Sequence, residues 1–256
     1  MSFMKAYILS VDGTIRSPSL LQTLESFGIE VHVTSGSTPD KALKYVEVNP
    51  RSKFKSAKLN EYELACAYGH LQMHQESLSS GDQKAFFFED DAYLNVDLFG
   101  SFLRSLSAMP KGLILLGTCG GIAWKASRFE NLSLFRVFGN AVSGSHAYLA
   151  DRNSIEMMVG KEKNLLNYAD KFARPRSLDL YVRYPFVAFQ IKENNPIILR
   201  ESGQDTRSKL RREIAWLYHD CVEFYKFGFA GGRYIESVIK KSVVRRLVFK
   251  LPGCRD

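Results

Sequence analysis

The stretch FFFEDDAYL, Phe86 to Leu94, joins three phenylalanines directly to three carboxylates. The run Lys84–Phe88 is continuous, apolar and of strand length, which predicts a strand covered on both faces in the middle of a sheet. Neighbouring anions repel one another, and carboxylates at the end of an apolar run are costly to leave without a partner. The stretch therefore predicts a buried strand that presents acidic side chains to a ligand.

Apolar runs and helical patterns alternate on both sides of this stretch. Lys5–Val11 has the pattern of a strand, Ser19–Phe27 has helical spacing, and Ile29–Val33 has the pattern of a second strand. This β-α-β start favours an α/β fold with parallel strands. We further expect helices at Leu59–Ser79 and Val96–Leu106 and strands at Gly112–Leu116, Leu134–Phe138, Ser145–Ala150 and Pro185–Ile191. Thr34–Lys58 has the pattern of a long loop, with a short helix as the alternative, and Gly117–Gly121 that of a glycine-rich turn.

A chain of 256 residues lies at the upper edge of single-domain size. We predict one α/β domain over residues 1–205 and a basic helical extension over residues 206–256. No apolar run approaches the ~20 residues needed to cross a bilayer. The N-terminus has the pattern of a first strand rather than of a signal peptide, so a cytoplasmic location is expected.

The four cysteines are Cys66, Cys119, Cys221 and Cys254. They are far apart in the sequence, they form no CxxC pair, and we find no histidine near them at ligand spacing. The pattern predicts neither a zinc site nor a disulfide framework, and it fits a reducing cytoplasm.

The net charge of +8 is concentrated at the C-terminus. Lys226–Asp256 holds eight Lys and Arg side chains against two acids, 8 − 2 = +6. Such a tail suits an anionic surface, either phospholipid headgroups at the inner face of the membrane or nucleic acid. A solvated C-terminal helix fits the same residues.

The acidic motif has the chemistry of a metal site. Ligands of open α/β sheets bind beyond the carboxyl ends of the strands. If the backbone stays extended, Glu89 and Asp91 point to the same side while Asp90 faces away. Their hard oxygens suit Mg²⁺ or Mn²⁺, which also bind phosphate. A structural cap or a surface ion pair is the alternative, and Asp90 as the direct ligand stays open.

Two adjacent segments carry a resemblance to a known family. LNEYELACAYGHLQMHQ (Leu59–Gln75), followed by AFFFEDDAYL (Ala85–Leu94), resembles glycosyltransferase family 25, which includes bacterial lipopolysaccharide and lipooligosaccharide galactosyltransferases. The family has a Glu-x-x-Cys-Ala-x-Ser-His helix before a strand that ends in Leu-Glu-Asp-Asp. The matching helix residues are Glu63, Cys66, Ala67 and His70, with Gly69 in place of the usual serine.

The later segments follow the same order. SHAYLADR (Ser145–Arg152) is similar to the family's His-Ala-Tyr strand, and SLDLYVRYPFVAFQ (Ser177–Gln190) is similar to its later Asp, Pro and Gln segment. The first strand lacks the family's Asn-Leu-Asp-Arg and has ILSVDGTIR instead, with Arg16 as the candidate counterpart. The resemblance runs from about Lys5 to Ser202.

The resemblance implies a GT-A fold, that is, a Rossmann-like mixed sheet flanked by helices. It also implies Mn²⁺ or Mg²⁺, a UDP-sugar donor that is commonly UDP-galactose, and a glycan or lipid-linked glycan acceptor in bacterial lipooligosaccharide, lipopolysaccharide or capsule synthesis. Transfer would invert the anomeric carbon, which requires a base for the acceptor hydroxyl. No nucleic-acid partner is expected.

The motif and the resemblance together define a candidate site, in which several residues have a structural alternative. His70 is either a diphosphate contact or a helix anchor, His146 is a metal or phosphate ligand or orients the acceptor, and Glu89 binds metal, ribose or sugar hydroxyls. The full set is Asp179 and Glu89 for catalysis, His70, Gly117, His146 and Gln190 for the donor, and Asp91, Asp90 and Glu89 for the metal.

Two other functions fit parts of the sequence less well. A glycoside hydrolase would use Glu89 with a second carboxylate across a cleft, whereas the carboxylates here are adjacent. A nucleic-acid-binding protein would explain the basic tail. However, the chain shows no aromatic-basic RNA motif or zinc finger, and its acidic motif would repel phosphate unless a metal intervened.

Overall fold

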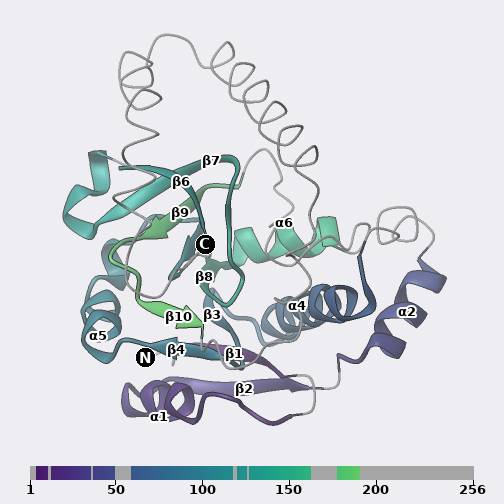
Figure 1. The fold of residues 1–256 in the computed structure, drawn as a ribbon. Coiled ribbons are helices and arrows are strands. Elements are labelled where there is room, and N and C mark those ends of the chain that lie inside the picture. The colour runs from purple at the N-terminus through teal and green to yellow at the C-terminus, as the bar shows by residue number, and fades with distance from the viewer. Residues whose placement is uncertain are drawn as a thin grey trace, which may run out of the picture. The chain divides into compact units, whose positions relative to one another are not determined.

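The structure is a computed structural model that describes residues 4–10, 13–35, 37–49, 59–117, 120–125, 127–162 and 178–190. All of them belong to one compact unit of the chain, Met1–Ile191 (Figure 1). The predicted domain boundary after residue 205 and the basic extension over residues 206–256 lie outside the described residues.

A mixed sheet of eight strands runs through the middle of this unit, in the order β2-β1-β3-β8-β5-β9-β7-β6 (Figure 1). β2, β1 and β3 are parallel, β8 is antiparallel to both of its neighbours, and β5 and β9 are again parallel. A separate pair joins β4 and β10. The strands are β1 (Lys5–Ser10), β2 (Glu30–Ser35), β3 (Lys84–Glu89), β4 (Ala92–Leu94), β5 (Leu113–Leu115), β6 (Gly120–Lys125), β7 (Leu134–Ser143), β8 (Ala147–Asp151), β9 (Leu180–Arg183) and β10 (Ala188–Gln190).

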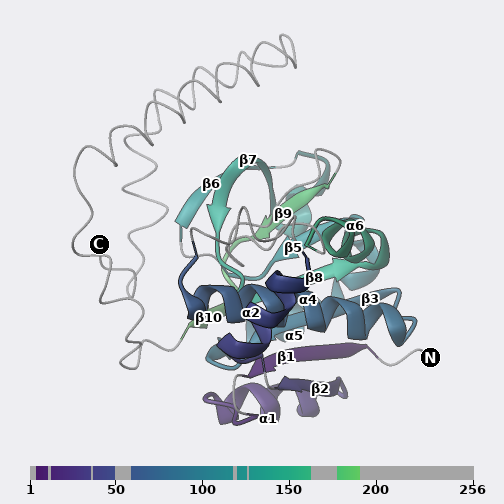
Figure 2. The same ribbon diagram turned by 90° about the vertical axis from the view of Figure 1, so that its right-hand side faces the viewer.

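Helices cover both faces of the sheet, which confirms the predicted mixed α/β architecture (Figures 1 and 2). One face packs against α1 (Pro18–Ser26) and α5 (Val96–Arg104), and a short 3-10 helix, η1 (Leu106–Ala108), follows α5. The other face packs against α2 (Pro39–Val48), α4 (Glu61–Ser79) and α6 (Arg152–Glu162). A second 3-10 helix, η2 (Ser127–Leu132), precedes β7.

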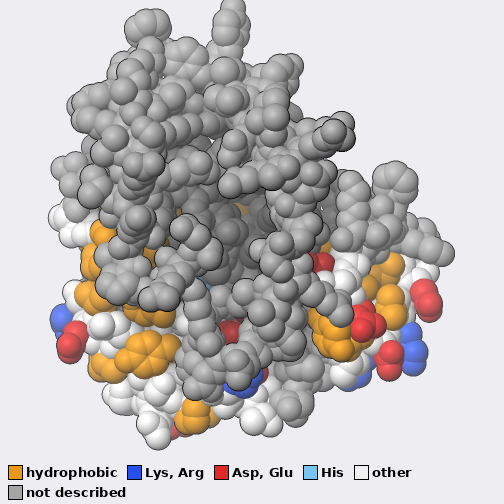
Figure 3. Space-filling view, viewed as in Figure 1, with side chains coloured by type: hydrophobic (Ala, Val, Ile, Leu, Met, Phe, Trp, Pro, Cys, Tyr) orange, Lys and Arg blue, Asp and Glu red, His pale blue; other side chains and the backbone are white. Residues whose placement is uncertain are grey.

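The helices of the described residues include none with the length and apolarity that crossing a membrane requires. Some large apolar side chains stay exposed, and apolar groups are visible at both lower sides of the face in Figure 3.

The phenylalanine run forms β3, with β1 and β8 on its two sides. Side chains alternate along a strand, so Phe86 and Phe88 face the α1 and α5 layer while Phe87 faces the α4 layer. All three are 0% exposed. Phe87 stacks between Tyr7 and Tyr148, with ring centroids 5.6 and 5.1 Å away. The predicted buried strand with both faces covered is therefore confirmed.

Contacts at the start and in the middle of α4, the helix before β3, determine where this helix begins and how closely it packs. Asn60 and Glu63 form a capping box, in which each side chain binds the other residue's backbone N–H. A Cβ at Gly69 would overlap the Leu9 side chain, so the absence of a side chain lets α4 lie close to β1. Glu63 therefore has a structural role at the start of α4, and Gly69 lets the helix lie close to β1.

Several predicted elements differ from the structure. Within Thr34–Lys58 the short helix that the sequence allowed is present as α2, because Thr38 caps a helix with Pro39 in its first turn. β9 was not predicted, and β6 begins at Gly120, inside the segment expected to be a turn. The last predicted strand is the short β10, which pairs with β4 outside the main sheet.

Gly117 follows β5 and is buried. A Cβ at this position would overlap the carbonyl oxygen of Ala188 and the Nε2 atom of His146. The glycine lets the chain pass close to its own β10 and to the residue before β8. This contact gives Gly117 a packing role.

We expect Gly117→Ala to lower the free energy of unfolding by about 1–3 kcal/mol, because the methyl group meets backbone rather than a flexible side chain. Urea unfolding of the two proteins measures the difference. Gly160→Ala in α6 is the matched control, since its Cβ meets no atom within 4 Å. Helix propensity should make that variant more stable by up to about 1 kcal/mol. Equal stability of the two variants would contradict the packing role.

Candidate active site

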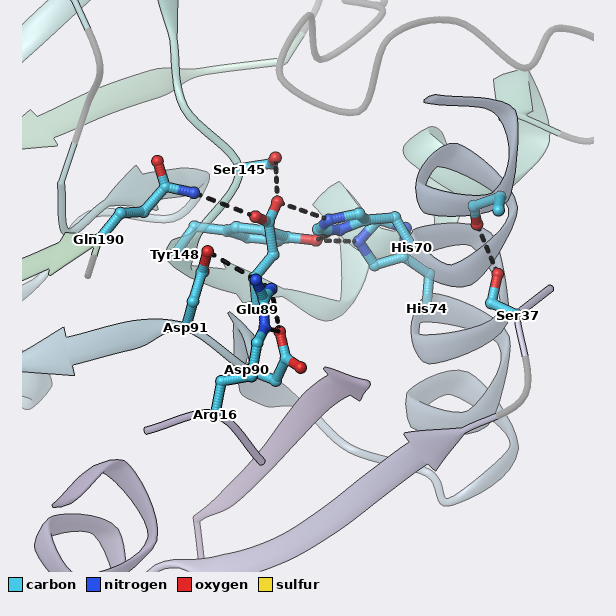
Figure 4. Close-up of polar contacts among 11 residues, drawn as sticks. Arg16, Ser37, His70, His74, Glu89, Asp90, Asp91, Ser145, Tyr148 and Gln190 are labelled. Atoms are coloured by element: carbon cyan, nitrogen blue, oxygen red, sulfur yellow. Dashed lines mark hydrogen bonds and ion pairs between the residues drawn. The ribbon is translucent and has the colours of Figure 1, made fainter. Parts of the chain in front are cut away.

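The site lies at the edge where β1, β3 and β5 end. These strands point the same way, so their carboxyl ends meet at one edge, which is where open α/β sheets bind ligands. Glu89 ends β3, Gly117 follows β5, and His146 precedes β8. Figure 4 shows how the polar side chains of this edge converge on Glu89.

Backbone hydrogen bonds hold the acidic turn in place. The Glu89 N–H donates to the carbonyl of His146 at 3.0 Å, and the Asp90 N–H donates to Leu9 at 3.1 Å. Because the strand ends at Glu89 and Asp90–Asp91 form a turn, the alternation expected for an extended segment is wrong here. Glu89 turns toward α4, whereas Asp90 and Asp91 both reach Arg16 (Figure 4).

Glu89 accepts hydrogen bonds from three side chains. Ser145 Oγ lies 2.5 Å from Oε1, His70 Nε2 lies 3.3 Å from the same oxygen, and Gln190 Nε2 lies 3.3 Å from Oε2. Burial alone would raise the pKa of this carboxyl. The hydrogen bond and positive charge of His70, with the Ser145 hydroxyl, outweigh burial and lower the pKa of Glu89 to about 2. Glu89 is therefore an ionised acceptor at neutral pH and a poor base.

Behind Glu89, a buried tyrosine links two histidines of α4. The Tyr148 hydroxyl lies 3.0 Å from His70 Nδ1 and 2.7 Å from His74 Nε2. The single hydroxyl proton of Tyr148 can go to only one of the two imidazoles, so Tyr148 donates to one histidine and accepts from the other. The contacts form a chain from His74 through Tyr148 and His70 to Glu89, and this chain positions the carboxylate.

We expect Tyr148→Phe to lower the free energy of unfolding by about 1–3 kcal/mol, since the loss of one hydroxyl deprives two buried imidazoles of a partner. Thermal or urea unfolding checks this. Tyr93→Phe is the control, because that side chain is 45% exposed and its loss should change stability by under about 0.5 kcal/mol. A Tyr148→Phe protein as stable as the parent would show that the chain contributes nothing.

Arg16 and the two aspartates form the other half of the site. The guanidinium binds Asp90 Oδ1 through Nε at 3.0 Å and Nη2 at 2.5 Å, and Nη2 lies 3.4 Å from Asp91 Oδ2. Asp91 is only 4% exposed, and its Oδ1 has no hydrogen-bond partner. Burial and then the charge of Glu89 raise the pKa of Asp91 to about 6, although Arg16 opposes the shift. The site therefore lacks positive charge at Asp91 Oδ1.

Because this pKa is raised, the contribution of Asp91 to the stability of the metal-free protein falls as the pH of the solution increases. An ordinary aspartate has a pKa of 3.8, so between about pH 4 and pH 6 the folded chain holds a proton that the unfolded chain has released. Stability from this group is complete below that window and is lost as the pH rises through it.

We expect Asp91→Asn, in chelator, to be more stable than the parent by up to about 3 kcal/mol near pH 7. The difference should vanish below about pH 4, where Asp91 is protonated in both states. Urea unfolding at the two pH values measures it. A variant that is less stable than the parent near pH 7 would show that Asp91 is well paired as a carboxylate.

His146 is the second buried group without a partner. It is 3% exposed, and neither ring nitrogen makes a hydrogen bond of ordinary geometry. Burial lowers the pKa of His146, opposed by the charge of Glu89 and by the nearby Ala188 carbonyl. A neutral imidazole with unused donor and acceptor atoms is suited to a ligand, as the sequence suggested.

Asp179 lies away from the other predicted site residues. It precedes β9, and its carbonyl accepts from the Leu113 N–H at the start of β5, so it belongs to the edge where β3 begins. The six residues of β3 separate the two edges by about 16 Å. Asp179 is also 44% exposed and forms an ion pair with Arg136 at 2.5 Å, rather than with the arginines near it in sequence. The structure therefore does not bring Asp179 to this edge, and its role as the base stays a prediction that the geometry does not support.

Sequence reasoning also overlooked partners that the structure supplies. Ser145, Tyr148 and His74 contact Glu89 directly or through the chain described above. The expectation that no histidine lies near a cysteine was wrong, because Cys66 and His70 are one helical turn apart. That four-residue spacing was readable in the sequence. The role of Tyr148 was not, because it depends on β8 lying beside β3.

These features define an α/β protein with an acidic ligand site at the carboxyl edge of its sheet. Residues 3–168 match glycosyltransferase family 25 (LPS biosynthesis protein), and since the match covers more than half of the chain, the chain belongs to this family. The resemblance found in the sequence is confirmed. Membership supports glycosyltransferase activity in lipopolysaccharide biosynthesis, with a nucleotide-sugar donor and a glycan acceptor. No curated protein matches the sequence.

Solved structures resemble the chain only distantly. A197 from STIV is 13% identical, with 75% of this chain and 86% of that chain covered and a TM-score of 0.39. HddC from Yersinia pseudotuberculosis, complexed with GMP-PN, is 12% identical, with 74% and 93% covered and a TM-score of 0.41. The mannose-1-phosphate geranyltransferase from Thermus thermophilus is 11% identical, with 72% and 74% covered and a TM-score of 0.37. Likenesses at these scores support no statement about activity.

Proposed function

We propose that the chain is a metal-dependent, inverting glycosyltransferase with a GT-A fold. It transfers a hexose from a UDP-sugar, with UDP-galactose as the first candidate, to a glycan or lipid-linked glycan acceptor in bacterial surface polysaccharide synthesis. Family membership supports the reaction class. The observation that carries the metal dependence is the buried Asp91 Oδ1 atom, which has no partner in a site rich in carboxylates.

The residues present fit a hard divalent cation. Three carboxylates meet at this edge, and Arg16 is the guanidinium that binds two of them. Mg²⁺ and Mn²⁺ bind through one or two carboxylates and complete their shell with phosphate oxygens and water. Asp91 is the proposed ligand, because Asp90 is bound by Arg16 through two nitrogens. When bound, the ion would neutralise charge on the leaving diphosphate.

The neighbouring side chains suit the donor sugar nucleotide. His146, with no partner on its ring nitrogens, offers a donor or an acceptor to phosphate or sugar. Gln190 donates to Glu89 Oε2 at 3.3 Å, and the remaining acceptor capacity of the carboxylate suits sugar hydroxyls. With its low pKa, Glu89 orients rather than accepts a proton. His70 serves this site through Glu89.

The basic segment Lys226–Asp256 lies outside the described residues. Its charge of +6, eight basic against two acidic side chains, supports a role in bringing a cytoplasmic enzyme to the anionic inner leaflet. This contact would place the enzyme beside a lipid-linked acceptor.

The test is a thermal-shift and transfer assay with a panel of UDP-sugars, with and without Mn²⁺. We expect stabilisation by UDP with Mn²⁺, transfer that stops in EDTA and returns with Mn²⁺ or Mg²⁺, and a drop of about 100-fold or more in kcat/KM for Asp91→Asn. Asp179→Asn is the matched control, because this exposed carboxylate lies on the far edge of the sheet. It should retain most of the activity.

Two outcomes would overturn parts of the proposal. Full transfer by Asp91→Asn would remove the metal role of that carboxylate. Loss of transfer in a folded Asp179→Asn protein would restore Asp179 as a catalytic candidate and would contradict the placement of the site.

A further inference from the structure

We propose that Cys66, His70 and Glu89 form a second metal site, which binds a soft or borderline ion of the Zn²⁺ class. One ligand atom from each residue lies within 4.8 Å of the other two. Cys66 and His70 are four residues apart, so they share one face of α4, and Glu89 ends the strand beneath that face. The site adjoins the proposed donor site but uses different chemistry.

The spacing of the nitrogen and oxygen atoms suits coordination better than a hydrogen bond. His70 Nε2 and Glu89 Oε1 are 3.3 Å apart, whereas a hydrogen bond to an ionised carboxylate is about 2.7–2.9 Å long. Zn–N and Zn–O bonds of about 2.0–2.1 Å place two tetrahedral ligand atoms about 3.3 Å apart. The Cys66 thiol is only partly buried and lies within 4.8 Å of the other two ligand atoms, so a small side-chain movement allows a Zn–S bond of about 2.3 Å.

The groups around these ligands can orient them when a metal is bound. Ser145 donates to Glu89 Oε1 and Gln190 donates to Oε2, so the carboxylate keeps both partners. His70 Nδ1 already contacts the Tyr148 hydroxyl, which also contacts His74. With the metal on Nε2, the Nδ1–H would donate to Tyr148 and Tyr148 would donate to His74. Such outer partners are typical of metal-binding histidines.

The donor set separates this ion from the one proposed at Asp91. Sulfur, imidazole nitrogen and one carboxylate oxygen favour Zn²⁺, whereas sites made of oxygen alone favour Mg²⁺ and Mn²⁺. Three protein ligands leave a fourth position for water or another group. A bound ion would fix Glu89 against α4 and so hold one wall of the donor site.

Cobalt spectroscopy of the full-length protein tests this proposal without any activity measurement. The chelator-treated protein is titrated with Co²⁺ in the presence of a phosphine reductant. We expect one equivalent to bind with a thiolate-to-cobalt charge-transfer band that one equivalent of Zn²⁺ removes. Cobalt bound only to oxygen atoms, as at Asp91, gives no such band. Tyr148→Phe should weaken binding by about 10–100-fold, as loss of an outer partner does.

Two matched variants assign the band to a cysteine. Cys66→Ser should abolish it, while a triple variant with Cys119, Cys221 and Cys254 changed to serine keeps Cys66 and should retain it. Absence of the band in the parent, or its survival in Cys66→Ser, overturns the site. If Cys66→Ser fails to fold by circular dichroism, a triple variant without the band overturns it equally. Because no sugar donor is used, the result is independent of the proposed transferase reaction.

Discussion

Two backbone hydrogen bonds at the end of β3 determine the position of everything else in the site. The N–H groups of Glu89 and Asp90 donate to the carbonyls of His146, just before β8, and of Leu9 in β1. A strand paired on both sides, with three buried phenylalanines, cannot shift without breaking the packing of both layers. The acidic turn is therefore held by the sheet itself, and Arg16 meets it from the loop before α1.

The pKa values of two carboxylates in this turn, Glu89 and Asp91, are shifted in opposite directions. Glu89 has a pKa of about 2 because the hydrogen bonds of His70 and Ser145, with the nearby histidine charge, outweigh its burial. Asp91, two residues later, has a pKa of about 6 because burial and the charge of Glu89 are only partly offset. The protein supplies hydrogen-bond donors to Glu89, whereas Asp91 Oδ1 has no partner and is suited to a cation. The same three-letter motif thus holds an orienting group and a ligand-binding group.

The sequence was informative where local patterns decide the structure. The apolar run, the helix at residues 61–79 and the first β-α-β unit follow from composition and spacing. The structure also brings His70 and Gln190, two of the residues named from the resemblance, to Glu89. Sequence patterns did not predict the side-chain positions that depend on the order and direction of the strands. Asp179 has a strand beside it like the other site residues, but it stands at the beginning of that strand rather than at its end. Tyr148 acquired a role only through the antiparallel pairing of β8 with β3.

The place of β9 in the sheet has a consequence for how the chain is assembled. β9 lies between β5 and β7, although β6 and β7 precede it in sequence by about forty residues or more. The hairpin of β6 and β7 therefore cannot join the sheet through its final neighbour until residues 180–183 have left the ribosome. Pairing at this distance in sequence is slow, because a long loop must lose entropy by closing before the contact can stabilise it. During synthesis, the edges of β5 and β7 that face β9 are the last parts of this sheet to find their partner.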